Sequence, residues 1–391
     1  MSHSSSAAEG ARARLQRLEG FIEHDPDNVN LLADAAECAL AAGDPGRARA
    51  HVQRALELAP GQGPLLLQLS SVAIAEYNFD DSVAITSALI GDGIDDAAVL
   101  FNHAFALVHL QRYDDALPVL QRLAQQVEVS PWVPRLTIRS LHALGDLDEA
   151  ITLAAAHLAS HPDDADVEGM LALLYFDNED MAAARRHAAH ALASQPDNLD
   201  ALLAAGMVAL ADEEVERGQD LLQRAVTVQP RSGRAWVGLA LAELMGFDLP
   251  AAERLMQQAL RHMPSHIGSW HLLGWVQLLQ QKVDEAEASF RSAYELDDTF
   301  GESHGALAAI AATRGQWAEA ERLAEVARRL DGESMAIRYV DLLRAAQSGR
   351  LSPDEVRALL TQAIRSMSAP AGGSLEAFAE RLKERKRTPS A

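Results

Sequence analysis

Histidine pairs at helical spacing are the residues of this sequence that could most readily bind a metal ion. His157 and His161 are four residues apart, and His187 and His190 are three apart, so each pair could share one face of a helix. A zinc site needs three or four converging ligands, and no cysteine or carboxylate stands at a matching spacing beside either pair. The sequence therefore predicts no metal site, and we expect these histidines to be solvated or packed.

Acidic clusters and glycine-rich stretches offer no clearer chemistry. Residues 163–166, 177–180 and 212–214 are rich in Asp and Glu, but they lack the central glycine and terminal glutamate of a calcium-binding loop. Gly91-Asp92-Gly93 follows no strand-like stretch, so it is not a nucleotide-binding loop. No Ser, His and Asp can be grouped into a triad, because residues this common carry no geometry. We therefore predict no catalytic residue, no cofactor and a protein that is not an enzyme.

Composition narrows the class of partner. The formal net charge is -22, from 56 acidic and 34 basic residues, and such a surface repels the phosphates of nucleic acids. Cys38 is the single cysteine, so the chain forms no internal disulfide, and we expect a small buried hydrophobe there. No apolar run is long enough to span a bilayer, and residues 1–10 show no secretory signal. We expect a cytoplasmic protein, and the preference for Arg over Lys is typical of a GC-rich bacterial genome.

A period of 34 residues runs through most of the chain. Proline recurs at one position of the period, as Pro26, Pro60, Pro162, Pro196, Pro230 and Pro264. A second position is always small: Ala48, Ser82, Ala116, Ala150, Ala184, Gly218, Ala252, Ala286 and Ala320. A third is small except at Ile138: Ala36, Ser70, Ala104, Ala172, Gly206, Ala240, Gly274 and Ala308. Positions kept small mark points where two helices approach too closely for a larger side chain.

Each repeat reads as two helices joined by a short turn. In the repeat that begins at Ile267, the first half has helical spacing at Trp270, Leu273, Gly274 and Gln277, and the second half has it at Ala286, Phe290, Ala293 and Tyr294. The turn is clearest at Gly145-Asp146, where glycine suits a helix C-terminus and aspartate can cap the next helix.

The period, the small columns, the Trp270–Leu273–Gly274 trio and the closing Pro264 resemble the tetratricopeptide repeat family. The resemblance implies an all-α, right-handed solenoid superhelix of helix–turn–helix repeats, with a concave groove lined by the first helix of each. We expect a disordered segment at 1–10, a capping helix at 11–28, nine repeats at 29–334, a degenerate capping repeat at 335–368, and a flexible linker with a short basic amphipathic tail at 369–391. Irregularities between 91 and 134 mark either a hinge or tolerated drift.

A second apolar stripe runs beside the core stripe of the first helices, so each member is either additional core or part of an exposed binding wall. The candidate partner-binding groove residues are Phe101, Asn102, Phe105, Arg135, Arg139, Leu173, Phe176, Leu203, Met207, Leu210, Val237, Leu241, His271, Trp275 and Leu278. Family members that clamp a peptide carboxylate use Lys, Arg and Asn in the groove, and only Asn102, Arg135 and Arg139 fall on that face here. An apolar ligand such as an amphipathic helix is therefore favoured, although Arg135 and Arg139 could still anchor a carboxylate.

The function that these patterns predict is non-catalytic protein binding. We expect an adaptor or co-chaperone that holds a partner peptide or helix in a largely apolar groove, with no nucleic acid and no membrane insertion. Two alternatives stay open. The chain could be an accessory subunit that recruits substrate to a separate enzyme, or a self-associating scaffold, and so a homo-oligomer, that is regulated by its basic C-terminal tail.

Overall fold

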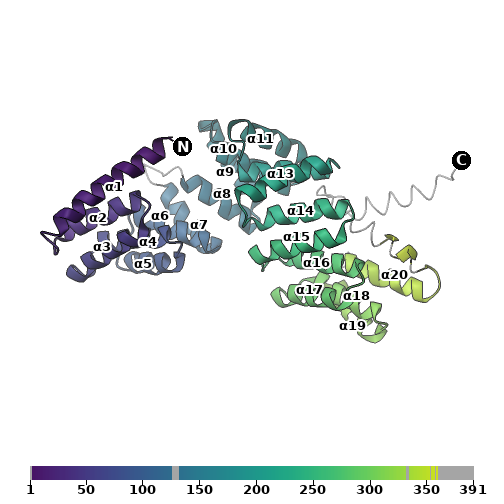
Figure 1. The fold of residues 1–391 in the computed structure, drawn as a ribbon. Helices are drawn as coiled ribbons and strands as arrows, with labels where there is room; N and C mark the ends of the chain where they lie inside the picture. Colours follow the sequence, from purple (N-terminus) through teal and green to yellow (C-terminus); the bar gives the residue numbers. More distant parts are fainter. Residues whose placement is uncertain (1, 126–131, 332–333, 353, 357, 360–391) are drawn as a thin grey trace. The chain divides into compact units, whose positions relative to one another are not determined.

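The structure, a computed structural model, describes residues 2–125, 132–331, 334–352, 354–356 and 358–359, and its regular elements there are the α-helices α1 to α20 (Figure 1). The chain divides into two compact units, Met1–Pro162 (unit 1) and Asp163–Ala391 (unit 2). Unit 1 contains α1 to α9 and unit 2 contains α10 to α20. The predicted all-α solenoid of stacked helix pairs is confirmed within each unit.

The helices repeat in register. The first helix of each repeat is α2 Val29–Ala41, α4 Gly63–Ala75, α6 Ala97–His109, α8 Trp132–Leu144, α10 Ala165–Asp177, α12 Leu199–Ala211, α14 Gly233–Met245, α16 Ile267–Leu279, α18 Gly301–Thr313 or α20 Met335–Gln347. The second is α3 Pro45–Leu58, α5 Phe79–Gly91, α7 Tyr113–Ala124, α9 Leu147–Ser160, α11 Met181–Ser194, α13 Val215–Val228, α15 Leu249–His262, α17 Val283–Leu296 or α19 Trp317–Leu330. All the second helices start 34 residues apart, so the repeats between 91 and 125 that lack the closing proline keep the register.

The N-terminal helix α1, Ser2–Ile22, is longer than expected. Residues 2–10, expected to be disordered, belong to this helix in the structure, and Leu15 and Leu18 anchor the helix in the core. Residues 2–10 contain four serines and only two alanines, so their own helix propensity is weak and the extension depends on the anchored part of the helix. The expected tail at 369–391, and the last part of the capping repeat beyond residue 359, lie outside the described residues.

The small columns mark the contact between the two helices of a pair. A Cβ atom on Gly274 of α16 would lie 2.4 Å from Cε1 of Phe290 on α17, and one on Gly206 of α12 would lie 2.7 Å from Cγ of Leu222 on α13. Ile138, the exception in its column, is only 1% exposed, and the position that corresponds to Phe290 in its repeat is Ala154, which is fully buried. The large and small partners are therefore exchanged in the α8/α9 pair.

The turn inside each pair has one backbone form. One residue per turn has φ between 60° and 85°, and these residues are Gly43, Tyr77, Gln111, Gly145, Glu179, Glu213, Phe247, Gln281, Gly315 and Gly349. The next N–H bonds to a carbonyl five residues back, as Asn78 does to Ala73 at 2.8 Å, which is the Schellman ending of a helix. Asp44 and Asp180 then cap the following helix, whereas Asp146, expected to do so, makes no capping bond. Six turns hold a residue other than glycine in a left-handed conformation.

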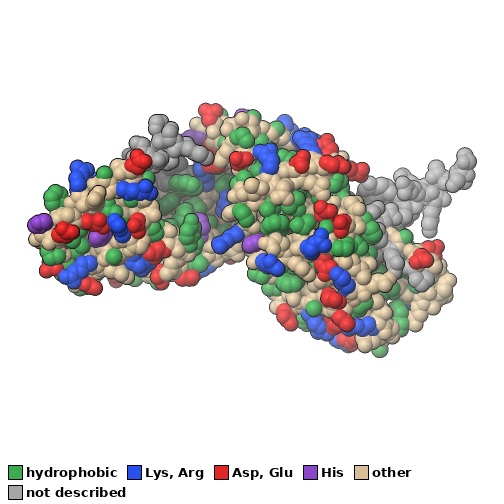
Figure 2. Space-filling model, in the orientation of Figure 1, with side chains coloured by type: hydrophobic (Ala, Val, Ile, Leu, Met, Phe, Trp, Pro, Cys, Tyr) green, Lys and Arg blue, Asp and Glu red, His purple; other side chains and the backbone are tan. Residues whose placement is uncertain are grey.

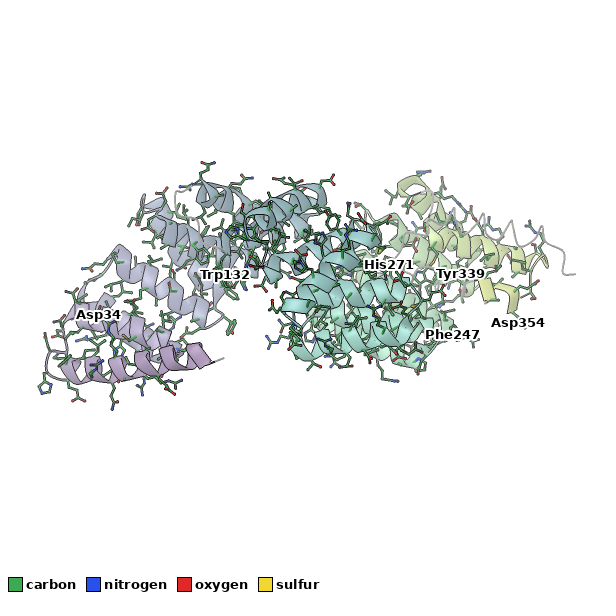
Figure 3. All side chains as sticks on the ribbon, turned by 90° about the horizontal axis from the view of Figure 1, so that it is seen from above. Asp34, Trp132, Phe247, His271, Tyr339 and Asp354 are labelled. Atoms are coloured by element: carbon green, nitrogen blue, oxygen red, sulfur yellow. The ribbon has the colours of Figure 1, made fainter. Side chains whose placement is uncertain are left out.

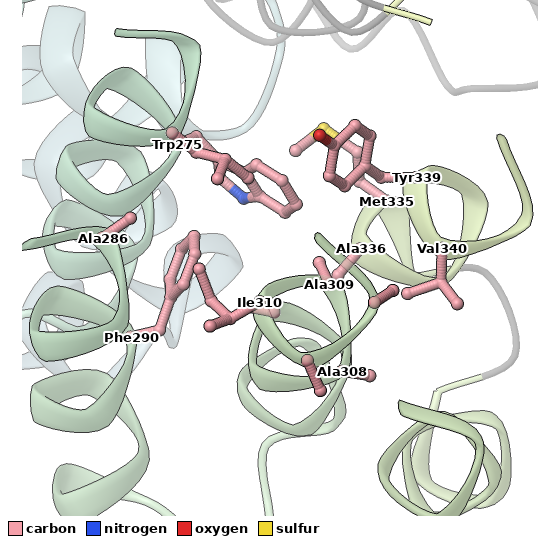
Figure 4. Close-up of a cluster of buried hydrophobic side chains, with 14 of the residues drawn as sticks. Trp275, Ala286, Phe290, Ala308, Ala309, Ile310, Met335, Ala336, Tyr339 and Val340 are labelled. Atoms are coloured by element: carbon pink, nitrogen blue, oxygen red, sulfur yellow. The ribbon is translucent and has the colours of Figure 1, made fainter. Parts of the chain in front are cut away.

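The C-terminal part of unit 2 contains its largest buried side chains (Figure 4). Trp275 on α16 is fully buried, and its ring packs edge-on against Phe290 of α17 at 5.2 Å and against Tyr339 of α20 at 5.8 Å. Helix α18 belongs to the repeat between those of α16 and α20, and it carries the small residues Gly305 and Ala309. Small residues on the middle helix thus leave room for aromatic rings from the repeats on either side.

Two polar groups are buried in the same region. His271 on α16 is 5% exposed, and its Nε2 lies 3.0 Å from Oγ of Ser303 on α18. Burial lowers the pKa of His271 to about 4, because the imidazolium loses its hydration. Glu302 on α18 accepts hydrogen bonds from Oγ of Ser334 at 2.5 Å and from the N–H of Ala336, so it joins α18 to the start of α20. Burial raises the pKa of Glu302 against these bonds.

Apolar surface elsewhere in unit 2 is less completely filled. A cavity of about 250 Å³ lies between α11, α12 and α13 and is lined by Leu192, Ala205, Val208 and Leu221, among others. Equivalent positions of other repeats carry Leu171, Leu239, Leu273 and Leu307 where this repeat has Ala205. The missing side chain accounts for part of the empty space.

The left-handed turns give a first prediction. Gln111→Gly and Glu213→Gly should each raise the free energy of unfolding by about 1 kcal/mol, because glycine adopts this conformation without a Cβ clash. Gly43→Gln is the matched control and should lower it by a similar amount. Urea unfolding measures all three, and equal stability of the variants and the parent would contradict the assignment of strain.

The cavity between α11, α12 and α13 gives a second prediction. Ala205→Leu should raise the free energy of unfolding by about 1–2 kcal/mol, since it buries three further carbon atoms. Leu239→Ala, at the equivalent position of the next repeat, should lower it by about 2–5 kcal/mol. A destabilised Ala205→Leu chain would show that the walls of the cavity cannot admit a leucine.

Buried His271 gives a third. The unfolded chain binds a proton at this residue below pH 6.5, and the folded chain does so only below about pH 4, so stability should fall as the pH is lowered through this window. Between pH 7 and pH 4, the His271→Gln chain should lose less free energy of unfolding than the parent, by up to about 3 kcal/mol. The comparison of urea midpoints at the two pH values measures the difference, and parallel losses in both chains would refute it.

Candidate partner-binding surface

Unit 2 buries most of the groove residues that the sequence predicted there. Eight of them are at most 9% exposed: Leu173, Phe176, Leu203, Leu210, Leu241, His271, Trp275 and Leu278. Met207 and Val237 are partly buried and pack on the same cores. The structure places these eight side chains in the core, where they pack against side chains of their own and of neighbouring repeats.

Unit 1 leaves its predicted residues more accessible. On α6, Phe101 and Phe105 are half-buried, and their rings lie 5.9 Å apart. The ring of His109, which is exposed one turn further on, stacks on Phe105 at 4.2 Å and on Phe79 at 4.6 Å. Tyr77, at a left-handed turn and 82% exposed, continues this aromatic row. The row presents apolar edges to solvent without a covering helix among the described residues of unit 1.

Helix α8 brings positive charge beside the aromatic row. Arg139 is exposed and Arg135 is half-buried, four residues apart on one face of the helix. The guanidinium carbon of Arg135 lies 5.2 Å from the ring centre of Trp132, which is 53% exposed. The structure thus brings together the predicted Phe101, Phe105, Arg135 and Arg139, on adjacent helices α6 and α8.

Asn102 has a structural role on this face. Its Nδ2 donates to Oγ of Ser70 and to Oγ of Ser71, both at 2.8 Å, and so joins α6 to α4. Gln68 of α4 likewise donates to the carbonyl oxygen of Ala33 on α2 at 2.7 Å. These bonds hold three first helices edge to edge.

We call the surface formed by α2, α4, α6 and α8 the α2–α8 face. One helix position on it carries Glu37, Ser71, Phe105 and Arg139, and its neighbour carries Ala33, Leu67, Phe101 and Arg135. Hydrophobic side chains gather over α6 and α8 in Figure 2, and Asp34 and Trp132, labelled in Figure 3, belong to its two outer helices. Trp132, Asp34 and Glu37 were not among the predicted residues, although a comparison of equivalent positions every 34 residues could have identified them.

Other clusters of charged residues pair with one another inside the fold. Oε1 of buried Glu168 on α10 lies 2.8 Å from Nδ1 of His187 and 2.9 Å from Nδ1 of His190, both on α11. Within the described ranges no group of three His, Cys, Asp or Glu residues has the geometry of a metal site. Burial would raise the pKa of Glu253, but hydrogen bonds from Lys282 and two glutamines together lower it.

A cavity of about 270 Å³ between α17, α18 and α19 has charged walls. Its arginines are paired with carboxylates: Arg314 with Glu287 and Asp284, Arg322 with Glu319, and Arg291 with Glu287. Because these pairs neutralise one another, the cavity is not a ready anion site. None of the helices of the described residues is long and apolar enough to cross a bilayer. Cys38 is buried, as expected, and burial raises the pKa of its thiol.

Comparisons with known proteins agree with this architecture. Family models described as tetratricopeptide repeat match residues 5–69, 107–174, 203–266 and 247–299. No curated protein matches the chain. Among solved structures, the human IFIT1 dimer with m7Gppp-AAAA is 13% identical with a TM-score of 0.57, and it covers 92% of this chain and 90% of that one.

The APC/C hetero-tetramer Cut9-Hcn1 is 14% identical with a TM-score of 0.50, covering 94% of this chain and 84% of that chain. MamA is 19% identical but covers 40% of this chain and 92% of that chain, with a TM-score of 0.36. At these identities the first two show the fold alone. Repeats of this kind are generally non-catalytic scaffolds. With its helix pairs, its 34-residue register and matches over more than half its length, the chain belongs to the tetratricopeptide repeat family and is a protein–protein interaction scaffold.

Proposed function

We propose that the protein is a non-catalytic adaptor that holds a peptide segment of a partner on the α2–α8 face of unit 1. One observation carries the proposal. The candidate groove residues of unit 2 are mostly buried in their own core, whereas those of unit 1 are half-buried or exposed and lie beside exposed Trp132. Aromatic surface that is left open beside arginine is the composition of binding hot spots.

The chemistry of the face indicates an amphipathic partner segment. Phe101 and Phe105 offer apolar area to one side of a helix or extended peptide. Arg139 and Arg135, at helical spacing, can donate to a carboxylate on the same segment. The rest of the face is nearly neutral on α4, where Ser71 and Leu67 occupy the equivalent positions. Binding would thus combine a central apolar contact with one charged anchor.

Substitution at the centre of the face tests the proposal. Phe105→Glu should abolish capture of the physiological partner, because it places a charge in the apolar contact. Arg139→Glu, at an exposed position of the face, should weaken capture by about tenfold, or about 1.4 kcal/mol. Quantitative mass spectrometry of proteins retained from lysate of the source cells measures both.

The matched control is Phe21→Glu on α1, an equally drastic change at a side chain that is 60% exposed and away from the face. Proteins captured by the parent and by Phe21→Glu, but lost from both Phe105→Glu and Arg139→Glu, would support the proposal. Circular dichroism should show the same helicity in all chains. Identical sets of captured proteins from all four chains would refute binding at this face.

A further inference from the structure

The α2–α8 face is polarised in charge from one side to the other. At equivalent positions it is acidic on α2, with Glu37, neutral on α4, aromatic on α6 and basic on α8, with Arg139. Asp34 and Glu37 are exposed, and neither has a hydrogen bond or ion pair with any described residue. A ligand that matched the whole face would therefore have a basic end, an apolar middle and an acidic end.

The face is continuous, so one ligand could contact all of it. Helix α2 packs on α4, α4 on α6 and α6 on α8. The side-chain bonds of Gln68 and Asn102 cross the first two of these contacts. Three steps between packed helices of 8–10 Å each make the face about 24–30 Å wide.

The chain contains a segment with the complementary order of groups. Residues 375–387 begin with the acidic Glu376 and Glu380, between which Phe378 stands, and end with four basic residues among five, Lys383, Arg385, Lys386 and Arg387. Leu375, Phe378, Ala379 and Leu382 have the spacing of one helix face. As a helix, these residues would be about 20 Å long, and the long Lys and Arg side chains would extend that reach.

We propose that residues 375–387 bind the α2–α8 face, with their basic end on Asp34 and Glu37 and their acidic end toward Arg135 and Arg139. This inference rests on the proposed function of the face, and it names the segment that covers the face when no partner is bound. A partner must then displace the segment, so the partner and the segment compete for the same face.

Titration calorimetry with a synthetic peptide of residues 374–391 tests the proposal on two chains, the full chain and one that ends at residue 368. The shortened chain should bind the peptide one to one. The full chain should bind it at least tenfold more weakly, because its own segment already occupies the face. No binding to the shortened chain, or equal affinity for both chains, would overturn the proposal.

Charge reversal tests the orientation. Glu37→Arg in the shortened chain should lower its affinity for the peptide by about tenfold. A peptide carrying Lys386→Glu and Arg387→Glu should bind this variant better than it binds the unsubstituted shortened chain. Asp80→Arg, at an exposed acid on α5, is the matched control and should change neither affinity. Equal weakening by Glu37→Arg and Asp80→Arg would mean that only net charge matters and would overturn the orientation.

An unrelated peptide with the same order of acidic, apolar and basic groups separates this inference from the proposed function. If it binds the shortened chain, loses binding in Phe105→Glu, and the tail peptide does not bind, then the face is a binding site with another occupant, and this inference alone fails. If neither peptide binds, the proposed function of the face loses its support as well.

Discussion

Several helix pairs have one point at which there is room for a single large side chain. Where the first helix carries Gly274, the second carries Phe290, and a methyl group on the glycine would collide with the ring. In such a pair, the separation of the two helices depends on a large side chain from one helix meeting a small residue on the other. The left-handed turn that closes each pair follows, because two helices held so close need a tight reversal.

The same close packing determines where surface remains for a partner. In unit 2, the small residues of α18 allow Trp275 and Tyr339, from the repeats on either side, to contact each other. The apolar side chains there that could have lined a groove are therefore part of the core. In unit 1 the first helices are joined by polar side chains, Gln68 and Asn102, that hold the helices together without covering the aromatic rings of α6. A difference in a few bridging side chains therefore separates a closed surface from an open one.

The repeat architecture could be predicted from sequence because its determinants are local and recur. The position of Ala286 is small in all nine repeats, so nine copies of one local pattern reinforce one another. The candidate site was predicted only in part, because exposure depends on residues far away in the chain. The side chain that covers Trp275 is Tyr339, two repeats further on, and no pattern within one repeat reveals it. Helix formation by residues 2–10 was missed for a related reason, since those residues extend a helix that is anchored elsewhere.

The exchange of large and small partners between Ile138 and Ala154 has an evolutionary consequence. Helix α8, moved alone into a repeat whose second helix carries Leu222 or Phe290, would bring two large side chains to the same point. The pair moved as a whole would bring its own matched contact with it. A duplication that keeps this pair whole therefore preserves its contact, whereas one that separates α8 from α9 does not.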